Sequence, residues 1–439
     1  MRIQDCRSCG SPDFHVVLDL GNHPLSDALL ENERQVREER RYPLQFAQCR
    51  ECSLLQVTET IPPEILFQRD YPYFSSSSPA LLAHAARHAE RLTHQKRLGA
   101  NSLVIEVACN DGYLLRNFVA RGIPCLGIDP AVGPATKARS LGIPVVNDFF
   151  SFKLAERLAE GGKYADVMIA NNVVAHVDQI NDFVAAFEKI LKPDGVATFE
   201  CAYAVDMIEK CEFDTIYHEH LFYHTLHSLK HLFARHGLYL NDAERLPVHG
   251  GSLRVYVSRH HEGSEQLLEL MEHEKSLGVA GSEWLEGFAE RVRNLRESLI
   301  HLLTAEKRNG RRVACYGAAA KGSTLLNYLD LGPDFFEFAA DANPFKQGRM
   351  MPGQHVPIVH PDWLLERRPD LVLLLVWNFA GEVLRQQSAY RAAGGRFVVP
   401  IPEPRIIESD EKIGGGDLAI PATAESVRNV IAGGQPEHA

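Results

Sequence analysis

The sequence predicts a multidomain α/β protein with a metal-binding module near its amino end. The chain has 439 residues, which exceeds what one hydrophobic core usually organises, so two or three domains are expected. Strand–turn–helix text occurs twice, near residues 102–122 and again near residues 311–329, and this order is typical of α/β domains. In addition, two Cys-x-x-Cys pairs lie within the first 52 residues.

The composition limits the partners of the chain. Hydrophobic residues make up 45% and charged residues 23%, as in ordinary soluble proteins. A formal net charge of −11 repels polyanions, so we expect a small-molecule partner and no nucleic acid. No apolar run reaches about 18 residues, and the amino terminus lacks the layout of a signal peptide. We therefore expect a cytoplasmic protein that does not bind a membrane.

The cysteine spacing predicts a structural zinc site. The four ligands are Cys6, Cys9, Cys49 and Cys52. A pair of thiolates two residues apart reaches one side of a tetrahedral zinc ion, and a second pair completes four sulfur ligands. The alternatives are free thiols in a reducing cytosol or a redox pair. Strand-like text, FHVVLDLG and YPLQFAQC, lies between the pairs.

A helical segment follows, in which the serine cluster 75–78 is typical of a helix N-cap before an amphipathic run from Pro79 to about Leu98. Tyr71 and Tyr73 lie on the loop that enters it. By pattern alone, two loop tyrosines are more often packing residues than catalytic ones.

The first strand–turn–helix unit predicts a nucleotide-type site. An apolar strand carries Glu106 near its end, and the next strand ends in Asp129, which can bind ribose hydroxyls. The turn does not match G-x-G-x-x-G, because Ala108 and Asn110 replace the glycines before Gly112. This speaks against NAD and favours S-adenosylmethionine, whose ammonium suits an acidic strand end; a purely structural turn is the alternative.

Two further groups sit where ligands bind in such folds. Asn171 ends a later buried strand, and His176 follows it. The segment FDTIYHEHLFYH then brings together Tyr217, Glu219 and His220. A histidine can take a proton near neutral pH, a carboxylate can orient it, and a phenol can donate to an oxyanion, which would serve enolate formation. A metalloprotease motif is excluded by Phe222, whereas a purely structural polar corner stays open.

Several motifs together resemble the sugar C-methyltransferase family: EVACNDGYLL, NNVVAHV, FDTIYHEHLFYHTLHSL, HGGSLRVYV and YGAAAKGSTLLNY, with the cysteine pairs. The resemblance covers almost the whole chain. It implies an N-terminal zinc-binding domain, a central class I Rossmann-like methyltransferase domain and a C-terminal Rossmann-like domain. The expected ranges are 1–62 for zinc, 63–260 for methyl transfer with a helical lid at 63–98, 261–309 for a helical connector, 310–410 for the nucleotide-sugar domain and 411–439 for a poorly ordered tail.

The resemblance also implies an activity: methylation by S-adenosylmethionine of a ring carbon, expected to be C3, of a nucleotide-diphosphate-linked 4-keto-deoxysugar, by a monomer. It makes His220 the base and assigns sugar and enolate contacts to Tyr71, His176, Tyr217 and Glu219, with Tyr73 as the alternative on the loop. The expected cofactor residues are Glu106, Ala108, Asn110, Gly112, Asp129 and Asn171.

Lys321, beside a predicted helix N-terminus, is the expected diphosphate partner, unless it is a solvated lysine. Two departures from the family pattern are Ala108-Cys109, where glycine and serine are usual, and Glu200-Cys-Ala-Tyr203, where EVPY is usual; the second leaves the sugar open. The rival activities are O- or N-methylation and non-catalytic binding of a nucleotide sugar.

Overall fold

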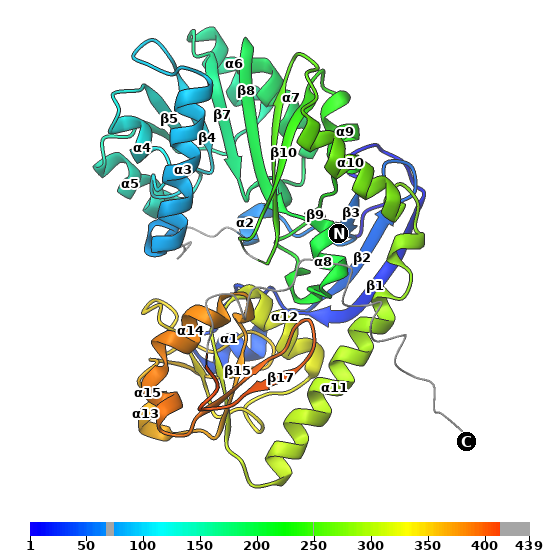
Figure 1. Ribbon diagram of the computed structural model, residues 1–439, viewed down its shortest axis with the longest axis vertical. Helices are drawn as coiled ribbons and strands as arrows, with labels where there is room; N and C mark the ends of the chain where they lie inside the picture. Colours follow the sequence, from blue (N-terminus) through cyan, green and yellow to red (C-terminus); the bar gives the residue numbers. More distant parts are fainter. Residues whose placement is uncertain (67–73, 249, 413–439) are drawn as a thin grey trace, which may run out of the picture.

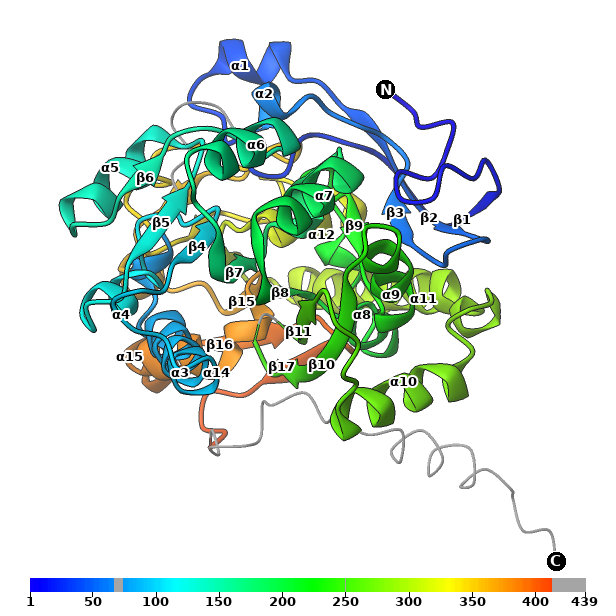
Figure 2. The same cartoon turned by 90° about the horizontal axis from the view of Figure 1, so that it is seen from above.

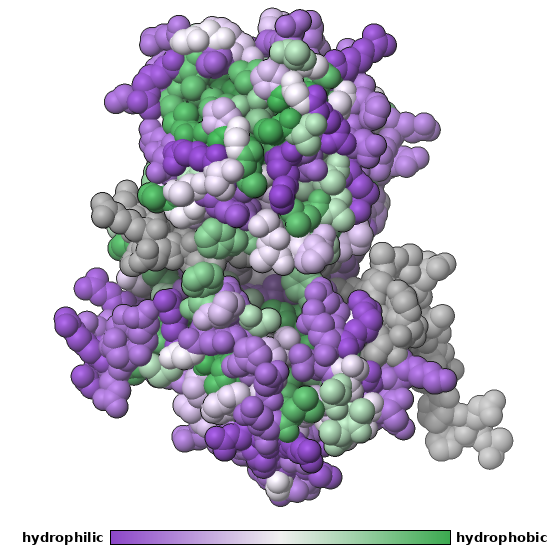
Figure 3. All heavy atoms as spheres, turned by 90° about the vertical axis from the view of Figure 1, so that its left-hand side faces the viewer, coloured by the Kyte–Doolittle hydropathy of each residue, from purple (hydrophilic) through white to green (hydrophobic). Residues whose placement is uncertain are grey.

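The structure is a computed structural model that describes residues 1–66, 74–248 and 250–412. Strands of the described residues form three sheets. Two of them organise an upper and a lower lobe, and the third lies alongside the boundary between the lobes (Figure 1). Figure 3 views the molecule from the side of α3 (Pro79–Gln95), where its outline narrows between the lobes.

The upper lobe is a seven-stranded sheet in the order β10-β11-β8-β7-β4-β5-β6. Its strands are β4 (Val104–Val107), β5 (Cys125–Ile128), β6 (Val145–Val146), β7 (Ala165–Asn171), β8 (Leu191–Ala202), β10 (Tyr239–Leu246) and β11 (Ser252–Ser258). The strands from β4 to β8 run parallel to one another, whereas β11 runs antiparallel to both of its neighbours, β8 and β10. The chain reverses its winding between β4 and β7, and open α/β sheets bind ligands at the carboxyl ends of strands at such a point.

Helices cover both faces of this sheet (Figures 1 and 2). They are α3, α4 (Arg116–Val119), α5 (Val132–Ser140), α6 (Phe152–Glu160), α7 (Ile180–Ile190), α9 (Leu226–Ala234) and α10 (Glu265–Leu277), with short 3-10 turns η1 (Ser75–Ser77) and η2 (Val174–His176). The helix α8 (Ala204–Glu209) and the 3-10 turn η3 (Phe213–Thr215) instead pack at the boundary with the lower lobe. The predicted helix after the serine cluster is confirmed. Ser78 caps α3 by accepting from the Leu81 N–H, and Pro79 opens its first turn.

The lower lobe repeats the doubly wound plan. Its sheet order is β14-β13-β12-β15-β16-β17, with β12 (Val313–Tyr316), β13 (Ala339–Ala340), β14 (Ile358–Val359), β15 (Leu371–Leu374), β16 (Arg396–Val399) and an antiparallel β17 (Arg405–Ile407). The helices are α11 (Phe288–Arg308), α12 (Ala320–Leu329), α13 (Trp363–Arg367), α14 (Ala380–Gln386) and α15 (Ser388–Ala392), with 3-10 turns η4 (Glu283–Leu285) and η5 (Trp377–Phe379). The winding reverses between β12 and β15, which is a second place where a ligand can bind.

The third sheet contains β1 (Phe14–His23), β2 (Tyr42–Cys49), β3 (Leu55–Val57) and β9 (Phe222–Tyr223), all antiparallel. In Figure 2 it lies on the side of the molecule opposite α4 and α5. Since β9 belongs to the segment FDTIYHEHLFYH, the amino-terminal sheet is completed by the region that carries His220.

Between β1 and β2 the chain crosses to the lower lobe, where α1 (Glu33–Glu38) lies (Figure 1). Leu30 pairs with Met350 through backbone hydrogen bonds, and Glu39 accepts from the Gly353 N–H at 2.8 Å. Ser323 of α12 donates its hydroxyl to the Ser26 carbonyl at 2.9 Å. The amino-terminal region therefore contacts the lower lobe as well as the upper one.

The two predicted connector helices divide between the lobes instead of forming a spacer. Buried Glu274 of α10 accepts from the Leu226 N–H, the His227 N–H and the Tyr203 hydroxyl of the upper lobe. In contrast, α11 buries Leu299 and Leu303 in the core of the lower lobe. A short helix, α2 (Pro63–Leu66), precedes the first gap in the described residues. Over the described chain, no helix is both long enough and apolar enough to cross a bilayer.

Candidate active site

The carboxyl edge of the upper sheet forms the nucleotide-type turn that the sequence predicts. Asp129, just beyond β5, accepts the Asn110 N–H on Oδ2 and the Ala131 N–H on Oδ1, each at 2.8 Å. Ala108 and Asn110 both have left-handed backbones, with φ of 55° and 50°. These are conformations that glycine adopts without strain. The turn therefore has the shape of a glycine-rich turn although it lacks two of the glycines.

Glycine is required at Gly112 on two counts. Its φ is 79°, and a Cβ there would come within 2.4 Å of the Ile143 side chain. This close packing holds the turn against α5 and the segment that leads to β6. Of the predicted cofactor residues, Gly112 thus shapes the turn and contributes no side chain of its own.

Glu106 and Asn171 present buried acceptors at this edge. Glu106 is 1% exposed, and burial, followed by the charges of Asp129 and Asp111, raises its pKa well above the usual range. Among the described residues, neither Glu106 Oε2 nor Asn171 Oδ1 has a hydrogen-bond partner. Burying an acceptor without a partner is costly, so both atoms fit a ligand that brings hydrogen-bond donors.

The segment before α3 is fastened to this turn. Asn110 Oδ1 accepts the Ser75 N–H at 2.9 Å, and Asp111 accepts both the N–H and the hydroxyl of Ser76. The ring of Phe74 lies 3.9 Å from where a Cβ on Gly133 would be. The predicted site residues Tyr71 and Tyr73 lie outside the described residues, just before this anchored stretch.

A buried ion network fixes α3 to the sheet, and it was not predicted. Glu200 of β8 accepts from His84 of α3 at 2.9 Å and from Arg254 of β11 at 2.7 Å. Burial opposes the charge of Glu200, but His84 and Arg254 outweigh it and lower the pKa of Glu200 to about 2. The sequence held a sign of this network, because Glu200 and Arg254 both lie in segments that were compared with the family pattern, Glu200-Cys-Ala-Tyr203 and HGGSLRVYV.

The central cluster lies in the loop between η3 and β9. Tyr217 Oη and His220 Nε2 are 2.9 Å apart, and their rings are 4.1 Å apart between centroids. The ring of His176, from η2, lies 4.8 Å from that of His220. The structure thus brings together three of the predicted catalytic residues from two separate segments.

The tautomer of His176 follows from its partner. Its Nδ1 lies 2.6 Å from the Glu219 carbonyl oxygen, so Nδ1 carries the proton and donates it, and Nε2 is the acceptor nitrogen. Burial lowers the pKa of His176. At neutral pH this ring is therefore uncharged.

Glu219 faces the amino-terminal region. Its Oε1 accepts the Asp27 N–H at 3.2 Å. Burial, together with the nearby charge of Asp27, raises the pKa of Glu219 to about 8, so the carboxyl group is mainly protonated at pH 7. Its Oε2 is buried without a partner in the described part of the chain. Sequence reasoning missed Asp27, which lies 192 residues away.

The other histidines of the segment have structural surroundings. His218 Nε2 donates to the Pro43 carbonyl at 3.1 Å, next to the ring of Tyr42. His224 is fully buried, and burial lowers its pKa to about 3. Tyr223 donates its hydroxyl to the Thr215 carbonyl at 3.0 Å. Of the titratable residues in this segment, Tyr217, Glu219 and His220 therefore belong to the candidate site, whereas His218, Tyr223 and His224 are held in the surrounding structure.

The four predicted zinc ligands come together at one point. The sulfurs of Cys6, Cys9, Cys49 and Cys52 all lie within 4.8 Å of one another, with the Cys6–Cys52 pair at 3.7 Å and the Cys9–Cys49 pair at 3.5 Å. A tetrahedral zinc with bonds of about 2.3 Å separates its sulfurs by about 3.8 Å. The donor set fits a closed four-sulfur zinc site, which has no open position for chemistry.

Lys321, the expected diphosphate partner, lies in the first turn of α12. Its Nζ lies 4.7 Å from the centre of the Trp377 ring and is buried without a hydrogen bond to the described residues. Burial raises the pKa of Glu212 to about 8 and also raises the pKa of Asp214, and the nearby charge of Lys321 opposes both shifts in part. Trp377 Nε1 donates to Asp214 at 2.7 Å. Lys321 therefore lies against an aromatic ring and near two buried carboxyl groups.

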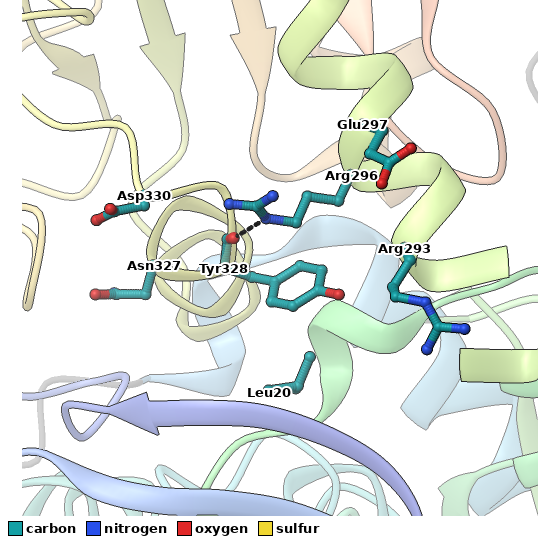
Figure 4. Close-up of a pocket in the computed structure, with 7 residues that line it drawn as sticks. All are labelled: Leu20, Arg293, Arg296, Glu297, Asn327, Tyr328 and Asp330. Carbon is teal, nitrogen blue, oxygen red and sulfur yellow. Dashed lines mark hydrogen bonds between the residues drawn. The ribbon is translucent and has the colours of Figure 1, made fainter. Parts of the chain in front are cut away.

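A separate hollow of about 430 Å³ lies between β1, α11 and α12. Figure 4 shows its lining: Leu20, Arg293, Arg296, Glu297, Asn327, Tyr328 and Asp330. Arg296 donates to the Tyr328 carbonyl at 2.6 Å. None of the predicted site residues lines it, and its mixture of two guanidinium groups and two carboxylates favours no single class of ligand.

The chain matches three family models in succession: a zinc binding domain at residues 6–67, a methyltransferase domain at residues 81–242 and a C-methyltransferase C-terminal domain at residues 247–402. It is 33% identical over 414 residues to the C-methyltransferase NovU of Streptomyces niveus, covering 94% of this chain and 98% of that protein. The chain belongs to the C-methyltransferase family. As a member of this family, it is a methyltransferase with an amino-terminal zinc-binding domain.

Two further likenesses cover only part of the chain. It is 32% identical over 97 residues to the ubiquinone biosynthesis O-methyltransferase of Rhizobium etli, covering 21% of this chain and 38% of that protein. A solved magnesium protoporphyrin IX methyltransferase of Synechocystis is 12% identical over 41% of this chain and 79% of that one, with a TM-score of 0.32.

The upper edge of the C-methyltransferase fits S-adenosylmethionine as its methyl donor. The unpartnered acceptors of Glu106 and Asn171 suit the ammonium and hydroxyl donors of that molecule. Asp129, at the end of the second strand, stands where ribose hydroxyls bind in such folds. The turn provides no glycine-rich cradle for a pyrophosphate, and S-adenosylmethionine has none.

Proposed function

We propose that this C-methyltransferase transfers the methyl group of S-adenosylmethionine to C3 of a nucleotide-diphosphate-linked 4-keto-deoxysugar, acting as a cytoplasmic monomer in the formation of a branched-chain sugar. Membership in the family supports carbon as the methyl acceptor. The observation that carries the proposal is the pairing of His220 with Tyr217 at 2.9 Å, beside the neutral carboxyl group of Glu219. A base next to a neutral donor is what enolate formation from a ketone requires.

His220 is the base. A carbon becomes a nucleophile only after it loses a proton, and a ketone acidifies only the carbons next to it. The imidazole of His220 takes this proton and becomes an imidazolium with two N–H donors. Tyr217 Oη, which lies 2.9 Å from Nε2, can accept one of them and so stabilises the charged ring.

Glu219 stabilises the enolate oxygen. Because its Oε1 already accepts the Asp27 N–H, the proton of the neutral acid belongs on Oε2, which is buried and unpartnered among the described residues. A carboxylic acid kept neutral near pH 7 can donate a hydrogen bond to a developing oxyanion. Loss of one such donor typically costs about 3 kcal/mol of transition-state stabilisation.

His176 helps to hold the sugar. Its Nδ1 proton is committed to the Glu219 carbonyl, so Nε2 can only accept, and a sugar hydroxyl is a suitable donor. This bond also joins η2 to the loop that carries His220. A second bond joins the same two segments, because the Leu221 N–H donates to the Ala175 carbonyl at 2.7 Å. His176 thereby orients the loop as well as the substrate.

When bound, S-adenosylmethionine supplies an electrophilic methyl group. The chain holds the carbon nucleophile in line with it, which is a positioning task that lowers the barrier by restricting the reactants. Because His220 lies at the boundary between the lobes and Asn110 and Asp129 line the upper edge, the two reactants can be held from opposite sides.

The test uses proton exchange at the carbon. In deuterium oxide, the wild-type protein should exchange the hydrogen next to the ketone of a thymidine-diphosphate keto-sugar, observed by NMR, and His220→Asn should abolish both exchange and methylation. Affinity for S-adenosylmethionine should remain near the wild-type value in calorimetry. Exchange that persists in His220→Asn would show that another group is the base. Transfer of a labelled methyl group from S-adenosylmethionine to an oxygen or nitrogen atom would support the rival activities.

A further inference from the structure

A tight turn after β1 brings Asp27 to the loop that carries His220. Within the turn, the Leu29 N–H donates to the Asp27 carbonyl at 2.9 Å. The residue before Asp27 is fastened to the lower lobe, because the Ser26 carbonyl accepts the Ser323 hydroxyl of α12 at 2.9 Å. The position of Asp27 is therefore fixed by backbone bonds on both of its sides.

The contact of Asp27 with the candidate site uses its backbone and leaves its carboxyl group unused. The Asp27 N–H donates to Glu219 Oε1 at 3.2 Å. The side chain of Asp27 is exposed, and its carboxyl group makes no hydrogen bond or ion pair with the described residues. An acceptor with no assigned partner thus lies next to a residue that the proposed mechanism uses.

Protein surrounds this carboxyl group although solvent reaches it. Burial raises the pKa of Asp27, and the nearby charge of Lys346 opposes the shift. Lys346 Nζ is itself held by the Ala318 carbonyl of the lower lobe, at 2.8 Å. The Asp27 carboxyl group therefore lies within electrostatic reach of both Glu219 and Lys346, and a substrate that reaches Glu219 can reach it as well.

The two neighbouring acids offer opposite halves of a hydrogen bond. The cation of Lys346 favours the ionised form of Asp27, and the charge of Asp27, after burial, raises the pKa of Glu219 to about 8. At pH 7 the proton of this pair is therefore on Glu219. Glu219 is 5% exposed and its Oε2 has no partner among the described residues. Glu219 can donate from Oε2, whereas the carboxylate of Asp27 can only accept.

A matching ligand has an acceptor oxygen with a donor group close to it. The oxygen of a ketone is such an acceptor, and a hydroxyl or amino group on the next carbon is such a donor. We propose that Asp27 is a further substrate-binding residue, whose carboxylate accepts a hydrogen bond from a hydroxyl or amino group on a carbon next to the ketone. This inference rests on the proposed function, because it takes the substrate to be a keto-sugar. It makes Asp27 a residue that selects among keto-sugars, since a sugar without the donor leaves the carboxylate unpaired.

Methyl transfer to a pair of sugars tests the contact. The pair is a thymidine-diphosphate 4-keto-sugar with a hydroxyl group at C3 and its 3-deoxy analogue, with kcat and KM measured for each at pH 7. The wild-type protein should prefer the hydroxyl sugar at least about tenfold in kcat/KM. Asp27→Leu should remove most of this preference by raising KM for the hydroxyl sugar. A change in the protonation of Glu219 acts on both sugars alike, so the ratio between them reports the contact alone.

A third sugar, with an amino group at C3, identifies the donor. The wild-type protein should prefer either the hydroxyl or the amino sugar over the 3-deoxy sugar. Asp27→Asn has the same shape but a neutral acceptor, so it should reduce the preference by a smaller factor than Asp27→Leu, and more for an ammonium than for a hydroxyl group. All Asp27 variants keep the backbone bond to Glu219, so their melting temperature and affinity for S-adenosylmethionine should match the wild type.

Glu31→Ala is the matched control. Glu31 is another exposed acid of the segment between β1 and β2, and it pairs with Arg349 at 2.9 Å instead of contacting the loop of His220. Its removal should change neither turnover nor the ratio between the sugars.

Equal kcat/KM of the wild-type protein for the 3-deoxy, hydroxyl and amino sugars overturns the inference. An equal loss for all three sugars in Asp27→Leu and Asp27→Asn also overturns it, because Asp27 would then act only through Glu219 or through the fold. In both cases carbon is still methylated and the proposed function stands. If no sugar is methylated at carbon, the proposed function fails and the inference fails with it.

Discussion

The protonation of Glu219 makes a prediction about pH. With a pKa of about 8, Glu219 is about nine-tenths protonated at pH 7 and about one-tenth at pH 9. If its O–H donates to the enolate oxygen, the rate of methyl transfer should fall about tenfold between these values, because only the protonated form can donate. The sign follows from the raised pKa: the active form is present below about 8 and is lost as pH rises.

Glu219→Gln tests this directly. A glutamine is the same shape as the neutral acid, because its oxygen can accept the Asp27 N–H and its nitrogen can donate where Oε2 does now. The variant should keep most of the activity at pH 7 and lose the alkaline decline, since an amide does not titrate. Glu219→Ala should cost about 100-fold at pH 7, as loss of an oxyanion donor does.

The assay is single-turnover transfer of labelled methyl from pH 6 to pH 9.5, with binding of S-adenosylmethionine measured at each pH. Asp27→Asn provides a second reading: removing its charge should lower the pKa of Glu219 and move the alkaline decline to lower pH. An unchanged decline in Glu219→Gln would refute the assignment, and an unmoved decline in Asp27→Asn would refute the coupling.

Two further predictions concern stability. Cys49→Ser should release one equivalent of zinc, measured by atomic absorption, and full zinc content in this variant would contradict the ligand set. The variant should also reduce turnover more than the affinity for S-adenosylmethionine, because the amino-terminal region holds Glu219 through Asp27. Gly251→Ala should destabilise the protein by about 2 kcal/mol in chemical denaturation, since a Cβ there would lie 2.5 Å from the buried Asp206 carboxylate. Gly263→Ala, which has room for a Cβ with its nearest neighbour at 3.8 Å, should leave stability nearly unchanged.

The sequence predicts best what depends on local pattern. The turn around Asn110, the helix after the serine cluster and the convergence of the four cysteines all follow from spacing, and the structure contains each of them. The left-handed backbone of Ala108 is different. Its residue type argues against such a φ, and only the tertiary frame, with Asp129 accepting the Asn110 N–H, holds the turn in that shape.

Interactions between distant segments could not be predicted. Asp27 reaches Glu219 only because the chain leaves β1, crosses to the lower lobe and returns as β2. Lys346 is likewise an ordinary loop lysine in the sequence, whereas Lys321 stands in a conspicuous motif. In the structure, Lys321 lies buried against the ring of Trp377, and Lys346 donates to the Ala318 carbonyl.

The loop that carries His220 is where the three parts of the protein meet. His218 bonds to Pro43 of the amino-terminal sheet, and the carbonyl of Ile216 accepts from Thr324 of α12 in the lower lobe. The Glu219 carbonyl holds His176 of the upper lobe. The loop that carries His220 is therefore in position only when all three parts are assembled. Within this loop, His218 bonds to the amino-terminal sheet and Glu219 accepts the Asp27 N–H, whereas Tyr217 and His220 lie against each other.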